Sequence, residues 1–284
     1  MASFKGSLST DGVEHRYFKR VFVILESDED VQIVKDRWFF DVGDAIEFNH
    51  ANSNGEGGGA NQVCNRVDEL LSQSETSFGI VDRDAIRMTH PDLWWETDDG
   101  KFRSARPMGN NVRVLSRWEI ENYLLDPEII EESLADIEAR PPRRGHTCTQ
   151  TLYGYLDAAV ALSAADVVAN CHGLRFDHSL DECPEAHLTD QIAKELGEHV
   201  GELPAAAARI RAFGSGEQSP SLEHWERISR MIDGKRLLRR IKLMQKRLGG
   251  NDRRLDLASK LRTRNRIPQE FSEHVEEFKA AARR

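Results

Sequence analysis

Short apolar runs alternate with amphipathic segments along the first half of the chain. Four apolar runs predict buried strands, at residues 20–26, 45–51, 78–82 and 112–116. Apolar residues at helical spacing predict helices, at residues 27–40, 61–72, 119–125 and 127–137. Strands that are joined by helices through short connections form parallel sheets with helices on their faces. The pattern therefore predicts an α/β fold with a Rossmann-like, mostly parallel sheet over residues 1–130.

The stretch between the third and fourth predicted strands, residues 83–110, shows neither periodicity. It contains Pro91 and Pro107, so we expect a long loop with a small hairpin. Beyond residue 130 the strand pattern stops. Helical patterns continue toward the C-terminus, at residues 151–171, 186–200, 221–248 and 253–282. We therefore expect residues 131–284 to form an α-helical region whose C-terminal helices are basic.

Composition narrows the class of protein. Apolar residues make up 39% and charged residues 31% of the chain, which is typical of a soluble, charge-rich globular protein. No apolar run approaches the roughly 18 residues that a membrane span needs, and the N-terminus lacks the apolar segment of a signal peptide. We expect a cytoplasmic protein that makes no contact with a membrane.

The net charge of −9 is unevenly distributed. Residues 226–266 contain 15 Lys or Arg against 4 Asp or Glu. A basic segment on an acidic body indicates contact with nucleic acid, and Arg236, Arg239 and Arg240 are then candidates for holding the phosphate backbone. The other interpretation is a solvated helix face.

Cysteine and histidine residues gather in one short stretch. Five of them fall within 17 residues: Cys171, His172, His178, Cys183 and His187. They offer zinc ligands, but their spacing matches no common zinc knuckle and none of the four cysteines forms a CxxC pair. We favour scattered loop residues with reduced thiols.

Carboxylates follow three of the predicted strands. Glu26 ends the first strand, Asp82 ends the third with Asp84 two residues on, and Glu119 follows the fourth. Carboxyl ends of parallel strands meet at one edge of the sheet, where sites gather. Taken singly, each acid has another explanation, because Asp-x-Asp after a strand is often a turn or a helix cap, and acids favour helix N-termini.

Two further acids complete a candidate metal site. The full set is Glu26, Asp30, Asp82, Asp84, Glu119 and Glu121. In an extended backbone, residues two apart point to the same side, which favours Asp82 and Asp84 acting together. Hard oxygen ligands prefer Mg²⁺, Mn²⁺ or Ca²⁺ to zinc, and we expect two ions of Mg²⁺ or Mn²⁺.

A glycine-rich loop at residues 52–60 offers a rival chemistry. Glycines before a helix can cradle phosphates. The chain contains no Gly-x₄-Gly-Lys-Ser/Thr sequence, so we do not expect a nucleotide-binding P-loop. We place this loop near the backbone of a substrate.

The sequences "VFVILESDEDV", "GIVDRDA" and "RWEIENYLLDPEII" resemble the TOPRIM domain, the metal-dependent fold of topoisomerases, primases and the OLD-family nucleases. The resemblance covers residues 20–130 and is closest to the OLD-like branch, which includes the effectors of the PARIS anti-phage system. Ser27 stands where TOPRIM proteins commonly have glycine. The resemblance implies that Glu26, Asp82 and Asp84 are catalytic metal ligands. It also implies that Lys235, in "IDGKRLL", contacts the scissile phosphate.

The same resemblance implies a function and partners. It predicts a Mg²⁺-dependent endonuclease that cleaves DNA, tRNA or another RNA as a toxic effector in anti-phage defence. OLD proteins carry an ABC-type ATPase in the same chain, whereas this chain has no Walker A motif, so a separate ATPase subunit is expected. A homodimer is expected as the active form. Two alternatives remain: a non-catalytic, metal-binding regulatory or docking subunit, and phosphoryl transfer on small nucleotides.

Overall fold

The computed structural model of the chain describes residues 20–51, 59–241 and 253–283. Its sheet has four strands: β1 (Val21–Leu25), β2 (Ile46–His50), β3 (Thr76–Val81) and β4 (Val112–Val114). The strands lie in the order β2-β1-β3-β4 and every pairing is parallel. The predicted α/β fold with a parallel sheet is therefore confirmed, and each observed strand lies within two residues of its predicted position.

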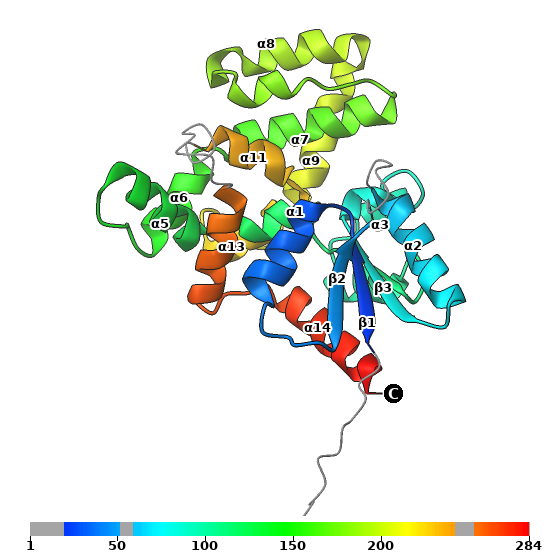
Figure 1. The fold of residues 1–284 in the computed structure, drawn as a ribbon. Helices are drawn as coiled ribbons and strands as arrows, with labels where there is room; N and C mark the ends of the chain where they lie inside the picture. The colour runs from blue at the N-terminus through cyan, green and yellow to red at the C-terminus, as the bar shows by residue number, and fades with distance from the viewer. Residues whose placement is uncertain (1–19, 52–58, 242–252, 284) are drawn as a thin grey trace, which may run out of the picture.

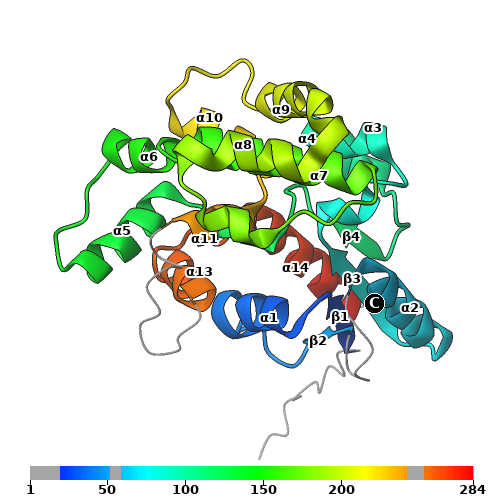
Figure 2. The same ribbon diagram turned by 90° about the horizontal axis from the view of Figure 1, so that it is seen from above.

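Helices cover both faces of the sheet, as the alternating side chains require. Ile24 points into a small core that it shares with helix α2 (Ala60–Ser72), whereas Val23 points into the large core on the opposite face. That second face is covered by α1 (Asp28–Val31), which continues as a π-helical segment η1 (Gln32–Trp38), and by the C-terminal helix α14 (Gln269–Ala282). Figures 1 and 2 show α2 on one side of the strands and α1 and α14 on the other.

Gly79 lets helix α2 approach the sheet closely. A Cβ atom at this position of β3 would lie only 2.6 Å from Cγ1 of Val63 on α2. Val63 is itself fully buried, so it cannot move away without opening a gap in the small core. Glycine at position 79 is therefore a packing requirement of this face.

The prediction of a long loop with a small hairpin at residues 83–110 is wrong. The segment contains no hairpin, and it forms three short helices. These are η2 (Arg83–Ile86), α3 (Pro91–Trp94) and α4 (Asp99–Ala105). Their centre is the buried guanidinium of Arg83, which donates hydrogen bonds to the carbonyl oxygens of Leu93, Trp94, Glu96 and Ser116. A polar side chain therefore organises this segment, and hydrophobic periodicity cannot reveal that.

The rest of the described chain is helical. Its elements are η3 (Ile120–Leu124), α5 (Pro127–Glu138), α6 (His146–Tyr153), α7 (Leu156–Cys171), η4 (His178–Glu182), α8 (Glu185–Leu196), η5 (Gly197–Glu202), α9 (Leu203–Ala212), α10 (Leu222–Ile228), η6 (Ser229–Met231), α11 (Gly234–Arg240) and α13 (Arg253–Thr263). The predicted helix 151–171 is broken after Tyr153, and the predicted helix 253–282 is broken before Pro268. Helix α9 was not predicted.

Among the described residues, no single helix has the length and apolar composition to cross a membrane. Helices α6 and α7 meet that test only when taken together, and they are bent by 46° relative to each other.

The C-terminal helix α14 joins the helical region to the sheet. Phe278 stacks on Phe78 of β3 with ring centroids 4.7 Å apart, and Phe271 meets Trp38 edge-on at 5.0 Å. Glu270 accepts a 2.5 Å hydrogen bond from the hydroxyl of Tyr123. The boundary at residue 130 stays a prediction, but the two parts share one hydrophobic core.

Candidate metal centre

Glu26 and Asp82 meet at the carboxyl edge of the sheet, where strands β1 and β3 end side by side. The carboxylate Oε1 of Glu26 accepts a 2.7 Å hydrogen bond from the backbone N–H of Asp82. The pKa of Glu26 rises from 4.5 to about 7, mainly because the carboxyl is buried and also because Asp84 and Asp30 repel its charge. The prediction that these acids lie together is confirmed.

Asp30 lies in the first turn of α1 and also caps that helix. Its Oδ2 accepts a 3.0 Å hydrogen bond from the N–H of Ser27, whose hydroxyl accepts a 3.2 Å bond from the N–H of Asp30. The pKa of Asp30 rises from 3.8 to about 6, mainly because the carboxyl is buried and also because the charge of Glu121 repels it. The helix-cap interpretation of Asp30 is therefore correct.

Asp82 and Asp84 reach the site by a different backbone path from the one predicted. The extended conformation ends at Asp82, and Asp84 lies in the first turn of the 3₁₀ helix η2. The argument that both side chains project from one face of a strand is thus wrong. The Oδ1 of Asp82 accepts a 3.1 Å hydrogen bond from the N–H of Ile120, and burial raises the pKa of both carboxyls.

Glu119 and Glu121 bring two more carboxylates to the same place from η3. Both are buried, at 5% and 1% exposure. The pKa of Glu119 rises to about 8 because of burial and the nearby carboxylate of Asp233, and that of Glu121 rises to about 7 because of burial and of Glu119. Buried carboxyls of this kind resist ionisation unless a cation lies beside them.

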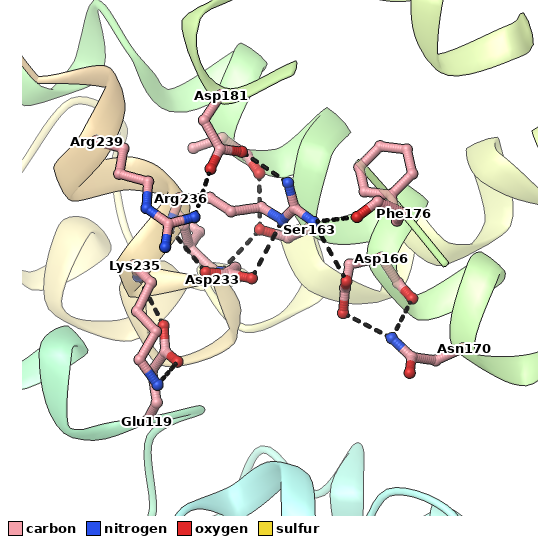
Figure 3. A network of polar contacts seen from close by, with 12 residues as sticks. Glu119, Ser163, Asp166, Asn170, Phe176, Asp181, Asp233, Lys235, Arg236 and Arg239 are labelled. Atoms are coloured by element: carbon pink, nitrogen blue, oxygen red, sulfur yellow. Dashed lines mark hydrogen bonds and ion pairs between the residues drawn. The ribbon is translucent and has the colours of Figure 1, made fainter. Parts of the chain in front are cut away.

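Lys235, at the start of α11, supplies such a cation. Its backbone N–H donates a 2.6 Å hydrogen bond to Oε1 of Glu119, and its Nζ lies 3.0 Å from Oε2 of the same residue. The Nζ is also 3.7 Å from Oε2 of Glu121. Burial lowers the pKa of Lys235, but the surrounding carboxylates outweigh it and raise the pKa. Figure 3 shows Lys235 directed at Glu119.

Asn122 and Gly234 hold the two segments together, and the sequence reasoning missed both roles. Asn122 accepts a 3.0 Å bond from the N–H of Glu119 and donates 2.5 Å bonds to the carbonyls of Ser229 and Ile232. A Cβ on Gly234 would lie 2.9 Å from two atoms of Asn122. Only glycine lets α11 pack this close, and Lys235 is placed as a result. The Gly-Lys pair in "IDGKRLL" was the sequence signal for this segment, although it indicated only a role for Lys235.

Two observations bear on whether these residues fit a divalent cation. The buried Oε2 of Glu121 has no hydrogen-bond donor within the described part of the chain, and every predicted ligand is a carboxylate, as Mg²⁺ prefers. However, no three of the six acids bring oxygens within 4.8 Å of one another among the described residues. The residues fit an ion by chemistry, and they must draw closer together to coordinate it.

The charges of the site are unevenly balanced. Lys235 and Arg254 pair with Glu119 and Glu121, since Arg254 lies 3.0 Å from Oε1 of Glu121. In the described chain no Lys or Arg forms an ion pair with Glu26, Asp82 or Asp84. The first group is in direct contact with protein cations, whereas the second group is attracted by Lys235 and Arg87 only from a greater distance. A metal ion is therefore expected on the Glu26 side.

Arg254 was not predicted, and the sequence contains no signal for it beyond the basic composition. It lines a cavity of about 300 Å³ beside the acids. The residues lining this cavity are Glu29, Glu121, Lys235, Leu238, Arg239 and Arg254. Three cations around one opening next to the carboxylates form a place where a phosphate group can lie.

The prediction that Arg236 contacts nucleic acid is wrong. Its side chain is 1% exposed, with Nη1 2.6 Å from Asp181 and further contacts to Asp233 and Asp166 (Figure 3). A buried side chain held by three acids cannot reach a phosphate backbone. Arg239 is partly exposed and also contacts Asp181 at 3.0 Å, so its predicted role remains open, as does that of Arg240.

The basic segment is used largely within the protein. Most described basic residues between 226 and 266 form ion pairs with acids elsewhere, namely Arg227, Arg230, Lys235, Arg236, Arg239, Arg254, Lys260, Arg262, Arg264 and Arg266. Residues 242–252 lie outside the described chain, as do residues 52–58 of the glycine-rich loop. The charge asymmetry therefore reflects internal neutralisation more than a free basic surface.

Within the predicted Cys/His stretch, no three of the described side chains gather into a metal site of their own. Cys171 is exposed and all four cysteines are free. Among the described side chains, the only group of three metal-ligand residues within 4.8 Å joins His172 to two residues of η5. The interpretation of scattered loop residues is wrong for Cys171, which ends helix α7, and for His187, which lies in α8.

Comparison with protein-family models gives no match to this chain, and comparison with curated proteins gives none either. The fold and the residues at the carboxyl edge of the sheet therefore carry the functional argument.

Proposed function

We propose that the chain is a TOPRIM-type, Mg²⁺- or Mn²⁺-dependent endonuclease of the OLD-like branch. The observation that carries the proposal is the bond from the Asp82 N–H to Glu26, which joins the ends of β1 and β3. Buried carboxyls with raised pKa values at a sheet edge mark a functional site on physical grounds. The sequence resemblance gives this arrangement its reaction class.

Each acidic group has a distinct part in the proposed site. Glu26, Asp82 and Asp84 would hold the first ion, because no described protein cation pairs with them. Asp30, Glu119 and Glu121 would support a second ion or orient a water molecule. When bound, the ions activate water and stabilise the leaving oxygen of a phosphodiester. Lys235 would neutralise charge that develops on the phosphate, since its Nζ already lies among these carboxylates.

The cavity beside the acids is the proposed path of the substrate backbone. Lys235, Arg239 and Arg254 line it, and Arg side chains hold phosphate oxygens through paired N–H groups. This arrangement supports a nucleic acid, DNA or RNA, as substrate. The proposed biological role is that of a toxic anti-phage effector that a separate ABC-type ATPase subunit controls and that acts as a homodimer.

The central test replaces the charge of Glu26 while keeping its shape. Glu26→Gln retains an oxygen that can accept the bond from Asp82, so the fold is preserved while the ligand charge is lost. We expect cleavage of duplex DNA, single-stranded RNA or total tRNA by the wild-type protein with Mg²⁺, and a loss of at least about 100-fold in the variant. Asp28→Asn is the matched control, since Asp28 is an exposed acid only two residues away, at the first position of α1. Equal cleavage by the Glu26 variant and the wild type would rule out this mechanism.

A second candidate function is a metal-binding subunit without catalytic activity. The observation in its favour is that no three of the predicted ligands lie within 4.8 Å of one another among the described residues. Titration calorimetry separates the two. Mg²⁺ binding that Glu26→Gln removes, in a protein that cleaves none of the three substrates with or without its ATPase, supports the regulatory function.

A further inference from the structure

Two histidines and a glutamate meet on the surface of the helical region, far along the chain from the acids of the sheet edge. Helix α7 ends at Cys171, and His172 follows it as the C-terminal cap. His199 and Glu202 belong to η5, which lies between α8 and α9. Residues three apart in a 3₁₀ helix are stacked above one another, so these two side chains project to the same side, toward His172.

The ligand atoms of the three side chains lie within 4.8 Å of one another. The Nε2 of His172 lies 2.7 Å from Oε1 of Glu202, and the Nδ1 of His199 lies 3.7 Å from the same oxygen. The imidazole rings are stacked, with centroids 3.7 Å apart and planes within 15°. Ligand atoms of a tetrahedral zinc ion are about 3.4 Å apart when each bond is about 2.1 Å. Both distances to the Glu202 oxygen are within about 1 Å of that spacing. Because the ring planes are nearly parallel, one imidazole must also rotate out of the stack before both nitrogen atoms can point at one ion.

The chemistry of the donor atoms selects the ion. Two imidazole nitrogens and one carboxylate form the ligand set of Zn²⁺ sites that keep an open fourth position. Mg²⁺ and Ca²⁺ prefer oxygen ligands only, so they would not compete well here. Glu198 adds a further carboxylate 3.8 Å from Nε2 of His199, which increases the attraction for a cation.

We propose that His172, His199 and Glu202 form a Zn²⁺ site that is separate from the carboxylate centre. The ion fastens the C-terminal end of α7 to η5, two elements that pack against each other and against α9. All three side chains are partly exposed, so the fourth position of the ion faces solvent. The proposal predicts that zinc stabilises this layer of helices.

The first experiment measures Zn²⁺ binding by calorimetry in excess Mg²⁺, with protein that carries no histidine tag. The Mg²⁺ occupies the carboxylate centre, so the remaining zinc signal reports the histidines. We expect one tight site in the wild type and binding at least about tenfold weaker in His172→Ala and in His199→Ala. His187→Ala is the matched control, because His187 is an exposed histidine on the neighbouring helix α8. Equal affinities in all four proteins would overturn the proposal.

The second experiment identifies the ligands. Cobalt substitution gives visible bands for a tetrahedral site, and a thiolate ligand adds a charge-transfer band in the near ultraviolet. The proposed ligand set predicts visible bands without the thiolate band. A thiolate band that disappears in Cys171→Ser would show that Cys171 is a ligand, and the assignment would be wrong. The melting temperature provides the last readout: Zn²⁺ should raise it in the wild type and in His187→Ala, but not in His172→Ala.

Discussion

Replacing the buried carboxyl of Glu121 by an amide should make the metal-free protein more stable while it weakens the candidate site. Glu121 is 1% exposed, and its surroundings favour the neutral form, because burial and Glu119 raise its pKa from 4.5 to about 7. Glu121→Gln keeps the shape of the side chain and removes the charge. Functional sites often carry destabilising groups of this kind.

The magnitude follows from the pKa. A rise from 4.5 to about 7 corresponds to about 3 kcal/mol of penalty on the charged form in the folded state. The folded protein binds this proton more tightly than the unfolded chain does, so stability falls as pH rises from about 4.5 to about 7. Above that window the penalty is complete, and below it the penalty is absent. The pKa of about 7 already includes the attraction of Lys235 and Arg254, so we expect a gain of up to about 3 kcal/mol at pH 8.

Urea denaturation in the presence of a chelator, at pH 4.5 and at pH 8, measures this difference. Glu131→Gln is a control that should change the free energy of unfolding in the opposite direction. Glu131 is equally buried, and although burial raises its pKa, Arg140 and the N–H of Arg143 lower it overall. Its ionised form therefore stabilises the fold above pH 4.5, and that contribution is lost as pH falls through its lowered pKa. Glu131→Gln should be less stable than the wild type at pH 8.

Three results would refute the reasoning. Glu121→Gln less stable than the wild type at pH 8 would mean that the pairs with Lys235 and Arg254 outweigh burial. An equal gain at both pH values would mean that the effect is one of packing. A gain in both Glu121→Gln and Glu131→Gln would mean that the amide is favoured for reasons unrelated to the pKa.

Three further substitutions test the scaffold of the site by urea denaturation. Gly234→Ala should cost about 1–3 kcal/mol, because the new Cβ would lie 2.9 Å from atoms of Asn122; stability equal to the wild type would contradict this close packing. Arg236→Met should cost about 2–4 kcal/mol by removing the buried guanidinium that pairs with Asp181, Asp233 and Asp166, and an unchanged midpoint would restore the surface role for Arg236. Glu270→Gln should cost about 1–3 kcal/mol, since an amide has one acceptor oxygen in place of the two that accept hydrogen bonds here; a neutral result would remove Glu270 from the contact between α14 and η3.

The sheet and its acidic edge follow from the sequence because both depend on local patterns. Each strand is a short apolar run, and the parallel order places the residues after β1 and β3 at one edge. Glu26 and Asp82 are therefore predictable without any tertiary information. Asp84 lies in the first turn of a 3₁₀ helix, whereas the sequence argument predicted an extended strand at this position.

Side chains that depend on distant partners were not predictable. Arg83 stands between two acids in the sequence, where no local pattern indicates burial. Its guanidinium is nevertheless buried, and it donates hydrogen bonds to carbonyl oxygens that come from residues up to 33 positions away. Arg236 reads as one of several cations on a basic face, yet its partner Asp181 lies 55 residues earlier. Composition reports how many charges a segment carries, whereas the fold decides which of them meet.

The two groups of acids at the sheet edge therefore differ in how their negative charge is balanced. Glu119 and Glu121 are held by cations of the helical region, because Gly234 lets α11 approach η3 and brings Lys235 with it. Glu26 and Asp82 share only a backbone hydrogen bond, and each faces the other's charge. A divalent ion relieves the most repulsion where protein cations relieve the least. The uneven pairing thus orders the proposed sites: the first ion belongs with Glu26 and Asp82, and a second can enter beside Glu121 only by competing with Lys235.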